Sequence, residues 1–182
     1  MAEKKVVEAQ VELTNEQIDV HVEELVTKAL KALKEFENFT QEQVDHIVAK
    51  CSVAGLDAHG ILAEAAVKET GRGVFEDKAV KNLFACEYVT SNLRHLKTVG
   101  VINEDKLTGI TEIAEPGGVV CGIVPTTNPT STVIFKSLIA LKTRNPIIFS
   151  FHPSAHECSA MAAKIIRDAA VKAGAPENCI QW

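Results

Sequence analysis

The sequence lacks the features that mark several classes of protein. Aromatic residues make up 5% of it, and no cluster of Lys and Arg accompanies its formal net charge of -5. A nucleic-acid partner is therefore not expected, because proteins that bind nucleic acid carry a basic surface. No apolar run reaches the roughly 20 residues that cross a bilayer. The first residues, Met1 to Lys5, lack the apolar core of a signal peptide. These absences predict a cytoplasmic protein that does not bind membranes.

Cysteine pairs with the spacing of disulfide or zinc sites are also missing. The five cysteines are odd in number, widely spaced and without a Cys-x-x-Cys pair: Cys51, Cys86, Cys121, Cys158 and Cys179. This spacing argues against a disulfide framework and a thiolate zinc site, and no metal site is predicted. We interpret all five as structural. Cys121 falls within an apolar stretch, where a free cysteine behaves as a small hydrophobic residue.

The most informative segment runs from Gly117 to Thr132. Val119 to Val124 is an apolar run rich in β-branched residues, which predicts a strand buried on both faces. Pro125 ends that strand, a polar turn follows, and helical spacing begins at Val133. In such βαβ units, ligands bind at the carboxyl ends of the strands. The hydroxyl, carboxamide and backbone N–H groups of the turn suit a phosphate, a ribose or a developing oxyanion.

The remainder of the C-terminal half continues the same α/β pattern. Residues 147–149 predict a second buried strand, parallel to the first if the crossover is right-handed, with Ser150 and His152 at its carboxyl end. An amphipathic helix is expected over 154–173, ended by Gly174. Residues 179–182 resemble the start of a third strand. The predicted fold class is therefore α/β.

The N-terminal half is expected to be helical. Capping-box patterns at Thr14 and Thr40 predict the starts of two helices. A third helix over 56–70 is expected to end at Gly71. Gly71-Arg72-Gly73 follows a helix rather than a strand, so it is not a dinucleotide-binding turn. The first helix and a fourth helix, over 77–96, carry apolar stripes that predict their buried faces: Ile18, Val22, Leu25, Ala29, Leu33 and Phe36 in the first, and Val80, Leu83, Phe84, Tyr88 and Leu93 in the fourth.

Between the two halves, residues 97–114 predict a pair of short strands around Asn103-Glu104-Asp105. An isolated hairpin is only marginally stable in water, so this one needs something to pair with.

Three blocks of sequence resemble the aldehyde dehydrogenase superfamily, and within it the CoA-acylating branch. They are residues 115–132, with Pro125-Thr126-Thr127-Asn128-Pro129 at their centre, residues 69–82, and residues 135–150. The resemblance covers most of the chain from about Phe39 onward, and it is strongest to the N-terminal part of the bifunctional aldehyde-alcohol dehydrogenases. It implies N-terminal helices, the first βαβ of a Rossmann-type cofactor domain and a protruding β-hairpin.

The resemblance also implies a reaction and a set of site residues. Full-length members convert an aldehyde, CoA and NAD to an acyl-CoA and NADH, reversibly, through a cysteine thiolate. That nucleophile is expected beyond Trp182, so this chain alone is expected to be inactive. Asn128 matches the family's donor to the substrate oxyanion. The residues matching the NAD site are Ile123, Val124, Pro125, Thr126, Thr127, Asn128, Ser150 and His152. Ser150 stands where many non-acylating members have a lysine that holds the adenosine ribose.

We therefore expect four segments: a mobile tail over 1–13, a helical part of the cofactor domain over 14–96, a hairpin for homo-oligomerisation over 97–116, and the incomplete first part of an NAD-binding domain over 117–182. For the full-length family, the resemblance implies that such oligomers can extend into filaments. The expected small-molecule partners are an aldehyde and an acyl-CoA. The alternatives are a non-catalytic interaction module, part of a stand-alone acylating enzyme, and an intact small dinucleotide-binding protein. The last lacks the glycine turn that it would need.

Overall fold

The first helices begin where the sequence predicts. The computed structural model describes residues 14–182, so the predicted tail over 1–13 lies outside the described residues. Helix α1 (Asn15–Phe36) and helix α2 (Gln41–Asp57) both start with complete capping boxes, at Thr14 and Thr40. Helix α3 (His59–Thr70) ends at Gly71, whose φ of 62° is a left-handed conformation that glycine adopts without strain. The structure thus confirms the caps of these three helices.

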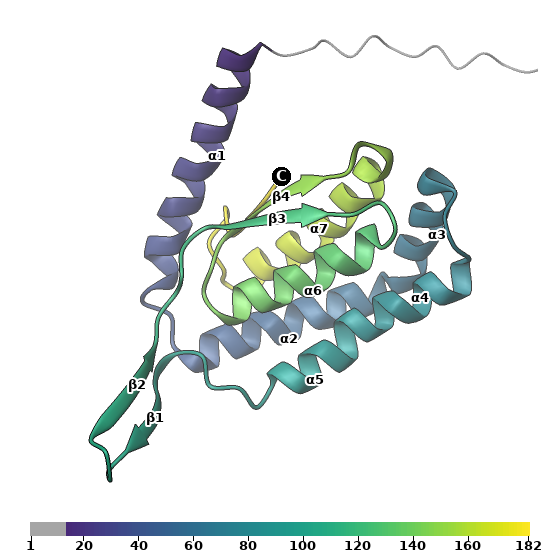
Figure 1. Cartoon of the computed structure of the whole chain (residues 1–182). Helices are drawn as coiled ribbons and strands as arrows, with labels where there is room; N and C mark the ends of the chain where they lie inside the picture. Colours follow the sequence, from purple (N-terminus) through teal and green to yellow (C-terminus); the bar gives the residue numbers. More distant parts are fainter. Residues whose placement is uncertain (1–13) are drawn as a thin grey trace, which may run out of the picture.

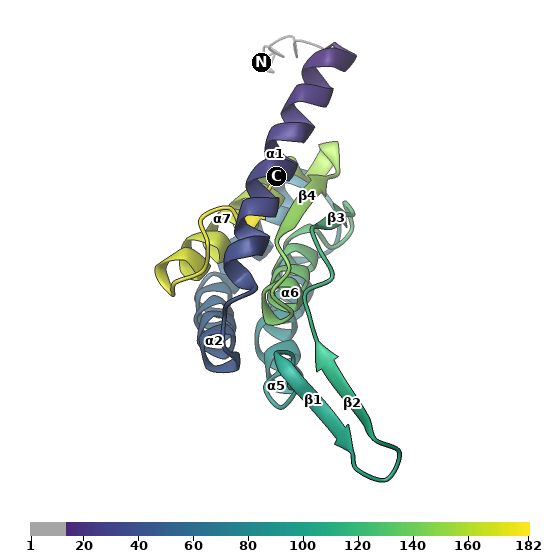
Figure 2. The ribbon, with the colours of Figure 1, turned by 90° about the vertical axis from the view of Figure 1, so that its left-hand side faces the viewer.

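The predicted buried face of α1 is only partly correct. Ala29, Ala32 and Phe36 are buried, whereas Ile18 and Val22 are 44% and 49% exposed. Figures 1 and 2 show the reason: the N-terminal part of α1 projects beyond the rest of the described chain. An apolar stripe records that a face can be buried, but it does not say whether anything packs against it.

The helix predicted over 77–96 is three elements, and its predicted buried face is wrong except at Leu83 and Leu93, which are half-buried. It consists of α4 (Phe75–Leu83), a π-helical turn η1 (Phe84–Tyr88) and α5 (Val89–Leu93). The apolar residues of the predicted stripe include Val80, Phe84 and Tyr88, which are 64%, 57% and 58% exposed. Of α4, the polar residues Lys78 and Asn82 are buried instead. The polar face of α4 therefore needs a partner inside the protein.

The C-terminal half is a parallel sheet with the strand order β3-β4-β5. Strand β3 (Val120–Val124) pairs in parallel with β4 (Ile147–Phe151), and β4 pairs in parallel with β5 (Ile180–Gln181), which confirms all three predicted strands. Helix α6 (Pro129–Lys142) connects β3 to β4. A short 3₁₀ turn η2 (Pro153–Ala155) and helix α7 (His156–Lys172) lead from β4 to β5.

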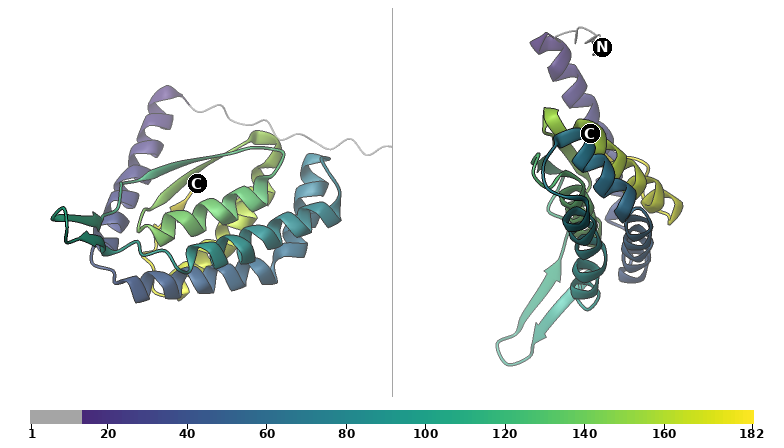
Figure 3. Two further views of the ribbon diagram at one scale, coloured as in Figure 1. Left: turned by 60° about the horizontal axis from the view of Figure 1, so that its bottom comes forward. Right: turned by 90° about the vertical axis from the view of Figure 1, so that its right-hand side faces the viewer.

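Helices α2, α6 and α7 form layers on one face of this sheet (Figures 1 and 3). Helices α6 and α7 lie nearest the strands, and α2 packs against both of them. The core between these layers includes Ile134, Leu138 and Ile166, each with no exposed surface. Gly122 permits close packing within the sheet, because an added Cβ would lie 2.7 Å from Cδ1 of Phe149.

Strand β3 is not buried on both faces, as the sequence predicted. Gly122 and Val124 face the helices and are buried, whereas Cys121 and Ile123 are exposed, Ile123 by 69%. The physical reason is that the helices of the described residues pack on a single face of β3. β-branched residues alone cannot distinguish a strand covered on one face from a strand covered on both.

The predicted hairpin is present, as β1 (Gly100–Asp105) paired antiparallel with β2 (Ile110–Ala114). It extends away from the sheet and helices (Figures 2 and 3). Its apolar side chains are exposed: Val101, Ile102, Leu107, Ile110 and Ile113. Cross-strand pairing alone therefore supports the hairpin along most of its length.

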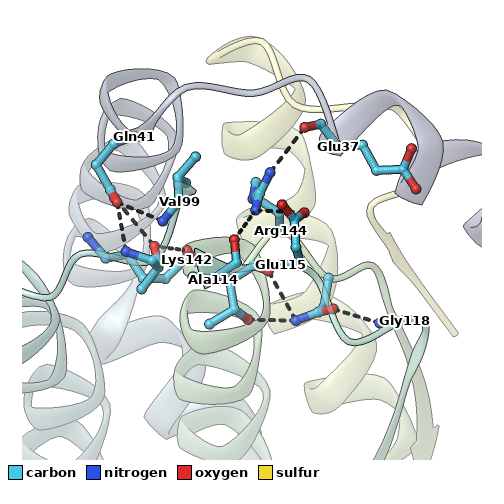
Figure 4. Close-up of polar contacts among 11 residues, drawn as sticks. Glu37, Gln41, Val99, Ala114, Glu115, Gly118, Lys142 and Arg144 are labelled. Carbon is cyan, nitrogen blue, oxygen red and sulfur yellow. Dashed lines mark hydrogen bonds and ion pairs between the residues drawn. The ribbon is translucent and has the colours of Figure 1, made fainter. Parts of the chain in front are cut away.

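Polar side chains fasten the base of the hairpin (Figure 4). On the β1 side, the amide oxygen of Gln41 accepts from the backbone N–H groups of Thr98 and Val99, at 2.7 and 3.1 Å. On the β2 side, the guanidinium of Arg144 donates to the carbonyl of Ala114 at 2.8 Å and to the carbonyl of Glu37 at 3.0 Å. The hairpin thus leaves the body at two anchored points.

An ion pair between a buried lysine and a partly exposed aspartate lies beside the first of these points. Lys142 is 1% exposed and its ammonium contacts the Asp45 carboxylate, which also accepts from Gln41 at 3.0 Å. The carbonyl of Lys142 accepts from the hydroxyl of Thr98 at 2.6 Å. The end of α6, α2 and the approach to β1 are therefore joined by one polar network.

Candidate functional site

Asn128 lies at the point where strand β3 passes into helix α6. The strand ends at Val124, and Asn128 stands at the N-cap position with φ -138° and ψ 60°. Pro129 follows as the first helical residue, where its missing N–H would have no intrahelical partner in any case. The Asn128 side chain makes no capping hydrogen bond to α6. Its carboxamide is therefore available for a different contact.

Ser150 and His152 reach the same edge of the sheet from β4. In the parallel register, Ile123 is opposite Ser150, and the backbone N–H of His152 donates to the carbonyl of Val124 at 3.2 Å. The Nδ1 atom of His152 accepts from the N–H of Ser154 at 3.1 Å, so the imidazole caps the turn η2. The structure thus brings the predicted residues of both strands together.

The predicted cofactor residues differ in what they present. The side chains of Ile123, Pro125, Thr127, Ser150 and His152 are exposed. Val124 is 1% exposed and packs in the core, so it offers only backbone atoms. The hydroxyl of Thr126 is buried and has no hydrogen-bond partner among the described residues.

This set of groups fits one part of a dinucleotide. The exposed side chain of Ile123 provides an apolar surface for a planar ring, and the exposed hydroxyl of Ser150 stands beside it in the register. The carbonyl of Ile123 accepts from the ammonium of Lys136 at 2.7 Å and has a second lone pair for another donor. The hydroxyl of Thr126 is enclosed by protein, so in this structure only the exposed groups of the set can meet a ligand. An exposed apolar side chain beside an exposed hydroxyl suits a planar ring with a sugar attached, which is the chemistry of one end of a dinucleotide.

The sequence interpretation missed the contacts by which side chains of α4 hold Asn128 and its loop. The ammonium of Lys78 donates to the carbonyl of Thr127 at 2.7 Å, and that of Lys81 donates to Oδ1 of Asn128 at 3.1 Å. The carboxamide of Asn82 accepts from the hydroxyl of Thr130 at 2.8 Å. We call Lys78, Lys81 and Asn82 the α4 cradle. Their i, i+3, i+4 spacing, which places side chains on one helix face, was the available signal.

The electrostatics of the α4 cradle are unusual. Burial lowers the pKa of Lys78, and the neighbouring positive charge of Lys81 lowers that pKa further. Lys78 is 6% exposed, and the partner found for its ammonium among the described residues is a neutral carbonyl. Burying a charge without an opposite charge is costly. The hydrogen bond from Lys78 to the carbonyl of Thr127 therefore forms despite the cost of burying the lysine charge.

The cysteines divide into four buried thiols and one exposed thiol. Cys51, Cys86, Cys158 and Cys179 are buried, as expected for structural positions, and Cys121 is exposed, which corrects the prediction that it is enclosed. Burial raises the pKa of Cys51, and raises the pKa of each of the other three buried thiols to about 12. Protonated buried thiols are poor nucleophiles. Over residues 14–182, no three His, Cys, Asp or Glu side chains are grouped as metal ligands would be.

The β3–loop–α6–β4 unit, with Asn128 at the carboxyl end of β3, is the parallel βαβ unit of an α/β domain. The chain belongs to the aldehyde dehydrogenase family, whose family model matches residues 3–182. It is 70% identical over 167 residues to aldehyde-alcohol dehydrogenase 2 of Entamoeba histolytica, a match that covers 91% of this chain and 19% of that protein. It is 54% identical over 158 residues to the bifunctional aldehyde-alcohol dehydrogenase of Escherichia coli K12, covering 87% of this chain and 18% of that protein.

Solved structures agree with this assignment. An acetylating aldehyde dehydrogenase from Geobacillus thermoglucosidasius superimposes with a TM-score of 0.87 at 49% identity, covering 89% of this chain and 36% of the other. Two more distant structures, each 28% identical, contain ligands: an engineered glycolyl-CoA reductase with NADP+ (TM-score 0.72) and a Rhodopseudomonas palustris propionaldehyde dehydrogenase with CoA (TM-score 0.73). Each match covers 87% of this chain. This chain spans about a fifth of the curated relatives. Within 14–182, no helix is both long and apolar enough to cross a membrane.

Proposed function

We propose that this chain forms the first part of a CoA-acylating aldehyde dehydrogenase that converts acetaldehyde, CoA and NAD to acetyl-CoA and NADH, reversibly. The observation that carries the proposal is the identity of 70% to an aldehyde-alcohol dehydrogenase, together with Asn128 at the carboxyl end of β3. The four buried thiols are poor nucleophiles, and the sequence around Cys121, which is exposed in β3, does not resemble the family's nucleophile segment. The catalytic nucleophile is therefore supplied from outside these residues.

In this proposal, Asn128 is the residue that touches the reacting atoms. Its NH2 group donates a hydrogen bond to the aldehyde oxygen as negative charge develops there, an interaction that typically accelerates such a reaction by about 10²–10³. NAD, when bound, accepts the hydride. The residues that hold it are Ile123, the backbone of Val124, Pro125, Thr126, Thr127, Asn128, Ser150 and His152.

The parent protein is proposed to be a bifunctional aldehyde-alcohol dehydrogenase that acts in fermentative ethanol metabolism in the cytoplasm. The bifunctional relative from Escherichia coli supports this parentage. The free thiols of the described residues fit a reducing compartment. The four-part division at residues 13, 96 and 116 is proposed with it, since the hairpin separates the helices from the sheet along the chain.

A second proposed role is association between copies of the chain through the hairpin of residues 97–116. The exposed apolar side chains of β1 and β2 favour it: Val101, Ile102, Ile110 and Ile113. The anchored base also favours it, because a fixed hairpin loses less conformational freedom on binding than a mobile one. Filaments would follow if the contacts repeat without closing into a ring.

The experiment that tests the enzyme assignment uses the full-length protein that carries this segment. It is assayed for NADH formation from acetaldehyde and NAD with and without CoA, and the Asn128→Ala variant is assayed beside it. We expect CoA-dependent activity, and a fall in kcat of about 10²–10³ in the variant with a small change in the KM for NAD. A wild-type protein without this activity would refute the assignment. A variant with unchanged kcat would refute the role of Asn128.

A further inference from the structure

The carboxamide of Asn128 has two ends, and only one of them helps the proposed reaction. An oxyanion needs the NH2 group, whereas the carbonyl end would repel it. Rotation of the amide by half a turn exchanges the two ends at little steric cost. Something must therefore select the orientation of the Asn128 amide before the substrate oxygen becomes charged.

The α4 cradle contains a group that makes this selection. Lys81 donates to Oδ1 of Asn128 at 3.1 Å, and an ammonium carries donors and no acceptor. The reversed amide would place its own N–H donors against those of Lys81. The reversed orientation is therefore disfavoured, and the NH2 group is directed away from α4.

Two further contacts hold the backbone on either side of Asn128. Lys78 donates to the carbonyl of Thr127 immediately before Asn128, and Asn82 holds Thr130 in the first turn of α6. Asn82 itself is fixed by donating to the carbonyl of His59 at 3.0 Å. The loop is thus held on both sides of Asn128 by residues from one face of α4.

The composition of the α4 cradle is unfavourable for stability alone. Lys78 is buried against a neutral carbonyl, and a second lysine lies one helical turn away, where like charges repel. An apolar face on α4 would pack against the core without either penalty. The polar residues are explained if their task is to hold the loop rather than to stabilise the fold.

We propose that Lys81 is a positioning residue that fixes the amide of Asn128 with its NH2 group toward the reacting oxygen, and that Lys78 and Asn82 hold the loop beneath it. This inference rests on the proposed function of Asn128. It predicts that the contribution of Lys81 to the rate passes through Asn128 and disappears when that side chain is removed.

A double-mutant cycle in the full-length enzyme tests this dependence. We expect Lys81→Met to lower kcat about 10-fold, the value of one hydrogen bond to a charged group, with a small change in the KM for NAD. Lys81→Arg, which keeps a donor-only cation, should retain most of the activity. In the Asn128→Ala background, Lys81→Met should change kcat less than about 2-fold. Lys68→Met, at an exposed position of α3, is the matched control and should resemble the wild type.

The outcomes distinguish a failure of the positioning role of Lys81 from a failure of the proposed function. An equal fall in kcat on Lys81→Met with and without the Asn128 side chain would overturn the inference, as would a Lys81→Arg variant as impaired as Lys81→Met. A wild-type enzyme without CoA-dependent activity would refute the proposed function instead. Crystal structures of the two Lys81 variants would then decide the inference: a displaced Asn128 side chain in Lys81→Met alone would support it, and the same pose in both would overturn it.

Discussion

Arg144 offers the sharpest test of how the hairpin is held, because its backbone and its side chain act in opposite directions on stability. It is the second residue after the end of α6, following the C-cap Thr143, and has a φ of 60°. Left-handed positions after helices usually hold glycine, since other residues are strained there. The backbone N–H of Asn145 donates to the carbonyl of Ala140 at 2.8 Å, which closes the helix end. The side chain must therefore offset the strain of the backbone.

The magnitude follows from the contacts of the guanidinium. Arg144 is 3% exposed and donates to two carbonyls, of Glu37 and Ala114, while the Glu115 carboxylate lies 3.5 Å away. A hydrogen bond to a charged group contributes about 1.5–3 kcal/mol. Both accepting residues are partly solvated, so we expect Arg144→Ala to lower the free energy of unfolding by about 3 kcal/mol in total. Arg144→Gly loses the same contacts but relieves the backbone strain, so it should be about 1 kcal/mol more stable than Arg144→Ala.

The assay is urea unfolding followed by the fluorescence of Trp182, the single tryptophan. Arg94→Ala, at an exposed position at the end of α5, is the control and should change the free energy of unfolding by less than about 0.5 kcal/mol. Amide hydrogen exchange at β2 should accelerate in both Arg144 variants, because the hairpin loses one of its anchors. The reasoning is refuted if Arg144→Ala is as stable as the wild type, or if Arg144→Gly is the less stable of the two variants.

Three further predictions concern the sheet, the thiols and the start of α7. Gly122→Ala should lower the free energy of unfolding by about 1–3 kcal/mol, because its Cβ would meet the ring of Phe149, whereas Gly60→Ala, with nothing within 4 Å, should not destabilise; urea unfolding distinguishes them. A thiol reagent should modify Cys121 in the folded chain and the other four cysteines only after unfolding, and a second fast-reacting thiol would contradict the structure. Burial raises the pKa of Glu69, but hydrogen bonds from the thiol and N–H of Cys158 and from the N–H of Glu157 lower it by more. The pKa of Glu69 is therefore below its ordinary value of 4.5. Its stabilising contribution is therefore present above pH 4.5 and lost as the pH falls through the lowered pKa; Glu69→Gln should remove this acid-dependent loss in urea titrations from pH 7 to pH 3, and an unchanged pH profile would contradict it.

Much of the fold could be predicted because it depends on short sequence patterns, such as helix caps. The capping boxes at Thr14 and Thr40 and the left-handed Gly71 are each decided by a few neighbouring residues, and the structure confirms them. The parallel pairing of β3 with β4 follows from chain connectivity and the handedness of crossovers. These features do not depend on what lies far away in the sequence.

The errors occurred where burial depends on distant partners. An apolar stripe on α1 and a β-branched run in β3 predict surfaces that can be covered, but packing decides which of them are covered. On α4 the apolar stripe gave the wrong face, since Lys78 and Asn82 are buried by their contacts with a loop 49 and 48 residues away. Periodicity cannot anticipate a polar face that is buried for the sake of another segment.

The sequence predicted where the candidate site lies, but not the side chains that hold it in position. Asn128, Ser150 and His152 were expected at one edge of the sheet, and they lie there because parallel strands end together. Their binding roles stay predictions. The α4 cradle and the anchoring by Arg144 were not foreseen, because each joins residues far apart in sequence through side-chain hydrogen bonds.

The π-helical turn between α4 and α5 has a consequence for which changes of length the chain can tolerate. In this turn the N–H of Val89 donates to the carbonyl of Phe84, five residues back, and the carbonyl of Cys86 is satisfied by the hydroxyl of Ser52 at 2.9 Å. Such a turn is an α-helix with one residue inserted. Deleting a single residue there would restore a regular helix of normal propensity, yet it would rotate α4 by about 100° relative to α5. The α4 cradle would then turn away from Asn128, so relatives that differ by one residue here are expected to have rebuilt the support of that loop as well.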